Sequence, residues 1–181
     1  MPGVRVRVPH RRQEGIVSIL AIDPGNTESA FALIDAETRK PIRVDKIPNG
    51  KLRAGLMTDL DGIDVVAIEM IASYGMPVGR EVFETCVWIG RFYERSPARA
   101  DVELVYRRDV KLHHCGSAKA KDANITQALI DRFAYGVPNR GKGTKAQPGW
   151  FHGFRADIWQ AYALAVLVAD RITPTTAEEA S

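Results

Sequence analysis

Two acidic residues stand at the ends of apolar runs in the first half of the chain. Asp23 ends the run 16–22 and precedes a Pro24-Gly25 turn, and Glu69 ends the run 65–68. An ionised carboxylate at the end of a buried strand is costly unless a cation or strong donors compensate it. If the two strands are neighbours, each carboxylate raises the pKa of the other unless a divalent cation neutralises both. We therefore expect a ligand at this sheet edge.

A third carboxylate, Asp157, opens the alanine-rich segment 157–172, which we expect to form an amphipathic helix. A helix packed across the same strand ends brings this acid to the other two. Carboxylate oxygens suit Mg²⁺ or Mn²⁺, and three such groups hold two ions about 4 Å apart in phosphodiester cleavage.

Each acid also has an ordinary structural interpretation. On this interpretation, Asp23 caps a turn and Glu69 pairs with a buried basic residue. Asp157 is then an acid that the helix dipole favours at a helix N-terminus. For Asp157 alone the ordinary interpretation is the better one. The two strand-end acids together favour a ligand site.

Composition narrows the class of protein. The chain has 181 residues, of which 45% are hydrophobic, enough for one domain with a full core. Its two cysteines, Cys86 and Cys115, have neither the number nor the spacing of a zinc site or a disulfide framework. No stretch approaches the roughly 18 uninterrupted apolar residues of a spanning helix, and the basic segment 1–15 lacks the apolar core expected of a signal peptide. We expect a cytoplasmic protein with no membrane partner.

Positive charge is concentrated in three segments, although the net charge is only +3. These are the arm 1–15, the stretch 107–121 and the loop 136–156, which contains no Asp or Glu. Any one of them is ordinarily a solvated loop. Together they favour a nucleic-acid backbone as partner.

The hydrophobic pattern predicts a mixed sheet flanked by helices. The expected strands are 16–22, 29–34, 42–47, 65–69 and 102–106. The expected helices are 52–60, 78–93, 108–114, 124–133 and 157–172, with a glycine-rich basic loop at 136–153. We predict a flexible basic arm at 1–15, one domain at 16–172 and a disordered tail at 173–181.

Several motifs resemble Holliday junction resolvases of the RuvC type. They are the Asp23-Pro-Gly-Asn turn, Glu69 closing Val-Val-Ala-Ile-Glu, the 111–122 region and Asp157-Ile-Trp-Gln-Ala-Tyr-Ala-Leu-Ala, in that order within 16–172. The segments 70–79 and 143–149 resemble phage and prophage members. The resemblance implies a ribonuclease H-like α/β fold, with three antiparallel strands followed by parallel strands in one sheet flanked by helices. It also implies a homodimer that resolves four-way DNA by paired incision, using two Mg²⁺ ions per site, with Mn²⁺ as an alternative.

The same resemblance assigns the metal ligands. Asp23, Glu69 and Asp157 match three acidic ligands, and the fourth acid of the family falls on Gln160, which offers an oxygen but no charge. Three residues are candidates to compensate for the missing charge, and His152 is preferred for its closeness to Asp157 in sequence. The three are Glu84, Asp122 and His152.

Further residues are expected to contact DNA. By the same resemblance, Lys111 and either Lys119 or Lys121, with Lys121 taken as the catalytic one, match lysines near the scissile phosphate, where positive charge stabilises the developing negative charge. Tyr74 is expected to stack on an unpaired base for about 1–3 kcal/mol, and Trp150 to be exposed beside DNA. The remaining expected DNA contacts are Arg80, Lys119, Arg140, Lys142 and Lys145.

Three other functions share parts of this pattern. An actin- or hexokinase-like ATPase also begins with an Asp-containing turn, but it needs a second phosphate loop that this chain lacks. A junction-binding module with a weakened site is consistent with Gln160. A related flap or branched-DNA nuclease shares the metal site and differs in dimer geometry.

Overall fold

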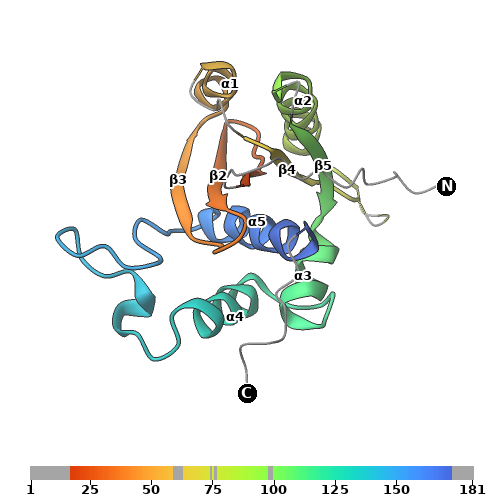
Figure 1. The fold of residues 1–181 in the computed structure, drawn as a ribbon. Helices are drawn as coiled ribbons and strands as arrows, with labels where there is room; N and C mark the ends of the chain where they lie inside the picture. The colour runs from red at the N-terminus through yellow and green to blue at the C-terminus, as the bar shows by residue number, and fades with distance from the viewer. Residues whose placement is uncertain (1–16, 59–62, 74, 76, 98–99, 173–181) are drawn as a thin grey trace.

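A computed structural model describes residues 17–58, 63–73, 75, 77–97 and 100–172. It contains a five-stranded mixed sheet in the order β3-β2-β1-β4-β5 (Figure 1). Strands β3, β2 and β1 pair antiparallel, whereas β1, β4 and β5 pair parallel. The expected mixed sheet is confirmed. The strands are β1 Ser18–Asp23, β2 Glu28–Asp35, β3 Pro41–Pro48, β4 Val65–Met70 and β5 Asp101–Tyr106.

Helices cover both faces of the sheet (Figure 1). They are α1 Asn49–Thr58, α2 Arg80–Arg95, α3 Arg107–Cys115, α4 Asp122–Phe133 and α5 Ile158–Ile172, with a short 3₁₀ helix η1 at Pro138–Gly141. Each expected helix is present within a few residues of its predicted bounds. The arm 1–15, the tail 173–181, the first residue of the predicted strand 16–22 and the last two of the predicted helix 52–60 lie outside the described residues. Among the described residues, no helix is both long and apolar enough to cross a bilayer.

Alternating residues of the central strands enter two separate cores. Ile19 and Ala21 of β1 face α5, while Leu20 and Ile22 face α1 and α2. All four side chains are fully buried. This two-sided burial explains why β1 is apolar at four consecutive positions rather than at every second one.

Helix α5 is enclosed on all sides. Every residue from Ile158 to Ala169 is buried, because the sheet lies on one side of the helix and α3 and α4 lie on the other. The prediction of an amphipathic helix is therefore wrong for this segment. Its alanines let the neighbouring layers approach closely, and a helix that is apolar all round is typical of such a core.

Strand register brings the two predicted acids together. Asp23 pairs with Ala30, and Ala30 pairs with Lys46 on the next strand. On the other side, Ile22 pairs with Ile68, so Glu69 follows beside Asp23. Because side chains alternate along a strand, both acids point to the same face as Ile19 and Ala21, towards α5.

The turn after Asp23 is held by a buried polar pair. Ser29 donates its hydroxyl hydrogen to Asn49 Oδ1 (2.6 Å), and Asn49 Nδ2 donates to the Gly25 carbonyl (2.8 Å). A Cβ on Gly25 would lie 2.4 Å from the Glu28 carbonyl oxygen, so only glycine fits here. The turn thereby fixes the backbone that carries Asp23.

Asp170, near the end of α5, ties four elements together. It accepts hydrogen bonds from Arg132 of α4 (2.6 Å), His113 of α3 (2.8 Å) and Arg39 of the β2–β3 turn (3.1 Å). Burial raises the pKa of Asp170, but the hydrogen bonds from Arg132 and His113 outweigh it and hold the pKa well below its usual range. The cluster anchors the C-terminal end of α5.

We expect Asp170→Asn to destabilise the fold by about 2–4 kcal/mol, because it leaves the Arg39 guanidinium buried without its carboxylate. Urea unfolding at neutral pH measures this loss. The folded pKa of Asp170 is depressed, so its contribution is complete above the usual carboxyl pKa near 4 and is lost as the pH falls below that value. The difference between wild type and variant should therefore shrink in acid. Asp131→Asn, at an exposed position on α4, is the control and should change stability by less than about 0.5 kcal/mol.

Candidate active site

Asp23 and Glu69 form the acidic centre of the site, at the adjacent ends of β1 and β4. Burial, followed by repulsion from Glu69, raises the pKa of Asp23 to about 8. Burial also raises the pKa of Glu69, although the neighbouring Arg107 opposes this effect. Like charges held together in a low-dielectric environment are costly. This edge of the sheet therefore attracts cations.

Arg107, the first residue of α3, supplies one such cation. Its Nη1 lies 3.0 Å from Glu69 Oε2 and its Nη2 lies 2.6 Å from Asp122 Oδ1. Because Met70 pairs with Tyr106 in the parallel ladder, the next residue of the chain emerges beside Glu69. Glu69 is therefore paired with a basic residue, which is the ordinary structural role considered for it from the sequence.

Lys46 of β3 supplies a second cation, on the other side of Asp23. Its Nζ lies 2.5 Å from Asp157 Oδ2, and this hydrogen bond raises the pKa of Lys46. Asp157 immediately precedes α5, where its carbonyl oxygen accepts from the amide groups of Gln160 and Ala161. The helix N-terminus also favours a negative side chain at this point.

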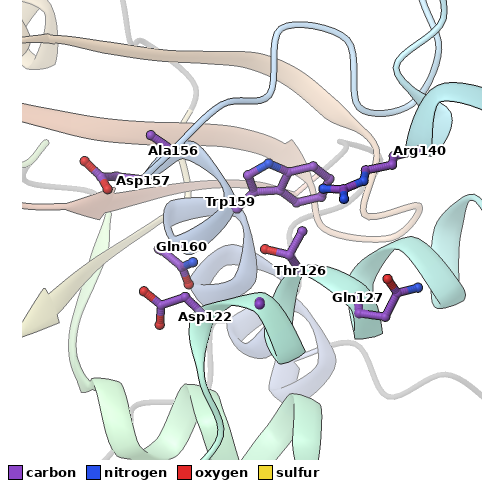
Figure 2. A pocket seen from close by; sticks show the side chains of 9 residues that line it. Asp122, Thr126, Gln127, Arg140, Ala156, Asp157, Trp159 and Gln160 are labelled. Carbon is purple, nitrogen blue, oxygen red and sulfur yellow. The ribbon is translucent and has the colours of Figure 1, made fainter.

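A pocket of about 440 Å³ opens beside these acids, between the beginnings of α4 and α5. Figure 2 shows Asp122, Asp157 and Gln160 gathered at one end of it, with Trp159, Thr126 and Arg140 along its length. Gln160 is 7% exposed, and its Oε1 has no hydrogen-bond partner among the described residues. A buried carbonyl oxygen without a donor is rare in native structures and is suited to a cation.

The donor chemistry of the site fits a hard divalent cation. Asp23, Glu69, Asp157 and the orphaned Gln160 oxygen are all oxygen ligands, and burial followed by repulsion from Glu69 raises the pKa of Asp23. Within the described residues, however, no three His, Cys, Asp or Glu side chains are close enough to form a metal cage. Two of the acids are instead paired with Arg107 and Lys46.

Of the three candidates to compensate for Gln160, Asp122 lines the same pocket and shares Arg107 with Glu69. His152 is exposed. Glu84 forms an i,i+4 pair with Arg80 on α2 (2.6 Å).

The three predicted lysines differ in how they interact with the acids. Lys111, on α3, is close enough to lower the pKa of Glu69, though its effect is small. Lys119 and Lys121 are exposed before α4 and form no ion pair with the acids among the described residues. Tyr74 lies outside the described residues.

The loop between α4 and α5 extends away from the body of the molecule (Figure 1). It carries Arg140, Lys142 and Lys145, and a bridge between Gly143 and Pro148 closes its tip. The expectation that Trp150 is exposed is wrong. Its ring stacks on Phe133 at 5.1 Å between centroids, and its Nε1 donates to the Tyr162 hydroxyl (2.9 Å). Trp150 thus anchors the base of the loop.

Sequence reasoning missed Arg107 and Lys46 as parts of the site. In the sequence, Arg107 is one of several positive charges in the stretch 107–121, and Lys46 is one residue of the predicted strand 42–47. A signal for Lys46 did exist, since a hairpin register that pairs Asp23 with Ala30 and Ala30 with Lys46 aligns all three across the sheet.

A five-stranded mixed sheet, with acids at adjacent strand ends and a helix beginning beside them, defines a ribonuclease H-like fold. More narrowly, the fold is of the RuvC type. It is similar to a structure of RuvC from Thermus thermophilus, with a TM-score of 0.59, 14% sequence identity, and coverage of 86% of this chain and 95% of that one. A structure of T. thermophilus RuvC in complex with a Holliday junction substrate gives a TM-score of 0.58 and 14% identity over 83% and 92% of the two chains. No protein-family model and no characterised protein sequence matches the chain.

We expect Gln160→Glu to make the protein sensitive to divalent cations. The variant adds a buried carboxylate to a pocket that already contains Asp122 and Asp157, which should cost about 1–3 kcal/mol in chelator. Mg²⁺ should restore the melting temperature. Gln127→Glu, an exposed position in the same pocket, is the matched control and should respond little to either condition. Equal melting temperatures of Gln160→Glu with Mg²⁺ and with chelator would contradict a cation-binding role for the pocket.

Proposed function

We propose that this protein is a metal-dependent endodeoxyribonuclease that resolves four-way or otherwise branched DNA by paired phosphodiester hydrolysis. The observation that supports the proposal is that Asp23 and Glu69 end adjacent strands of a RuvC-type fold, with Asp157 and the orphaned Gln160 oxygen at the start of α5. A similar structure, of T. thermophilus RuvC, is a complex with a Holliday junction substrate. The proposal includes a cytoplasmic location, where the DNA of a bacterial or phage-infected cell is recombined.

Asp23, Glu69, Asp157 and Gln160 would hold two Mg²⁺ ions, with Mn²⁺ as an alternative. Bound ions of this kind activate the attacking water and stabilise the leaving oxygen in phosphodiester hydrolysis. The protein itself supplies the burial of Asp23 and the strand register that keeps Asp23 beside Glu69. Lys111 and Lys121 would add positive charge beside the scissile phosphate.

DNA contacts outside the acidic centre follow from exposed positive charge. Arg140, Lys142 and Lys145 lie on the loop that extends from the body beside the pocket, where they would bind the phosphate backbone. Lys119 would contribute on the α3–α4 connection, Arg80 at the start of α2, and Tyr74 by stacking on a base.

Helix α2 supports the proposal of a homodimer. Its buried side is formed by Thr85, Ile89 and Phe92, while Phe83 and Val87, on the opposite side, are 62% and 53% exposed. An apolar stripe on an exposed helix face is typical of an interface. A two-fold dimer would present its two sites to two of the four strands of a junction.

A junction-binding module without cleavage is the second candidate. It is favoured by the pairing of Glu69 with Arg107 and of Asp157 with Lys46, together with the neutral Gln160. The two candidates share DNA binding and differ in catalysis, so a cleavage assay separates them.

We expect Asp23→Asn and Glu69→Gln each to lower junction cleavage by at least about a hundredfold while junction binding persists. Asp23→Asn should fold normally, because it removes a buried charge and keeps the shape of the side chain. Labelled four-way junction, duplex, flap and RNA–DNA hybrid are each incubated with Mg²⁺ and with chelator.

Glu37→Gln, in the exposed β2–β3 turn, is the control and should cut like wild type. Full activity in both site variants would refute the site. Tight junction binding without cutting by the wild type would support the module, and a preference for flaps would support the related nuclease.

We expect Phe83→Glu to convert the dimer to a monomer, because a carboxylate in an apolar contact must be desolvated without a partner. Sedimentation velocity measures the change. Tyr135→Glu, at an 83% exposed aromatic residue after α4, is the control and should remain dimeric. A wild type that is monomeric at all concentrations would exclude the dimer.

A further inference from the structure

Arg107 occupies the centre of the acidic edge rather than its rim. Its guanidinium bridges Glu69 and Asp122 with contacts of 3.0 and 2.6 Å, and it also lowers the pKa of Asp23. The side chain is 22% exposed, and that of Glu69 is 14% exposed. One guanidinium therefore interacts with three carboxylates, which belong to Asp23 of β1, Glu69 of β4 and Asp122 of α4.

The bridge uses the geometry particular to arginine. A planar guanidinium presents separate N–H groups to two acids at once, whereas a lysine ammonium is a single point of charge. Asp122 is 64% exposed and opens α4, so the bridge fastens the start of α4 to the end of β4. Without Arg107, Glu69 would be a buried carboxylate beside another acid.

The same bridge occupies one of the two carboxylate oxygens that Glu69 offers to a divalent cation. Glu69 Oε2 accepts from Arg107 Nη1, and an ion coordinated by that oxygen would compete with the guanidinium both for the lone pairs and for the negative charge. Lys46 holds Asp157 in a similar way, but it contacts one acid only and its side chain is 33% exposed. Arg107 is therefore the stronger competitor.

We propose that Arg107 is the resident counter-ion of the ion-free site. It positions Glu69 and Asp122 in the absence of metal, and it must release Glu69 when a divalent cation binds. The inference rests on the proposed function in so far as the site takes a divalent ion. Arg107 is a positioning residue, because it acts through the acids that it holds.

The test compares Arg107→Gln with Arg108→Gln. Both variants remove one positive charge from the first turn of α3, but Arg108 is exposed and has no ion-pair partner among the described residues. Mn²⁺ alone is titrated into each full-length protein by calorimetry, without DNA, and melting temperatures are measured in chelator and in Mn²⁺.

Arg107→Gln should bind Mn²⁺ about tenfold more tightly than Arg108→Gln, because the competing charge-assisted hydrogen bond is gone. In chelator it should melt at a lower temperature than wild type, and Mn²⁺ should reverse the difference. Arg107→Lys should recover part of the ion-free stability, because it restores the charge without the two-acid bridge. Circular dichroism verifies that each variant is folded.

Two results would overturn the inference, and they are distinguishable. If Arg107→Gln binds Mn²⁺ no more tightly than Arg108→Gln, Arg107 does not compete with the ion, and the proposed nuclease function is unaffected. If neither wild type nor variant binds Mn²⁺, the exchange fails together with the metal-dependent function.

Discussion

Repulsion between buried carboxylates at one sheet edge is the constraint on which the site depends. Strands β1 and β4 are apolar on both faces and pair in parallel, and this pairing leaves Asp23 and Glu69 side by side. Burial of both faces of these strands stabilises the core. It also places two carboxylates side by side where the strands end, which is unfavourable. The pKa of about 8 for Asp23 expresses that cost. Asp122 and Asp157 add negative charge near this pair, and Arg107 and Lys46 supply positive charge.

Two positively charged side chains reach the acids from the two edges of the sheet. Strand β3 brings Lys46 to Asp157, and the junction of β5 with α3 brings Arg107 to Glu69. Helix α5 is held at both ends, by Asp157 at the acidic edge and by Asp170 among Arg39, His113 and Arg132. A helix buried along its length and anchored at each end is a rigid support, and a site built on rigid elements keeps its geometry.

Internal cations offset part of the negative charge when no ion is bound, which distinguishes the arrangement from an open cage of acids. Internal cations neutralise Glu69 and Asp157, while the Gln160 oxygen remains without a donor. In the exchange proposed for Arg107, a divalent ion would replace an internal cation instead of filling a preformed hole.

The sequence by itself determined the mixed sheet and the acids at its strand ends, because apolar periodicity and the Pro24-Gly25 turn are local properties of the chain. It also located the helix that begins after Asp157. Only the tertiary structure decided which charges meet, since Arg107 and Glu69 are 38 residues apart and Lys46 and Asp157 are 111 apart. It also showed that α5 is enclosed on all sides and that Trp150 packs inward, because burial depends on layers contributed by α3, α4 and the sheet, which no local pattern reports.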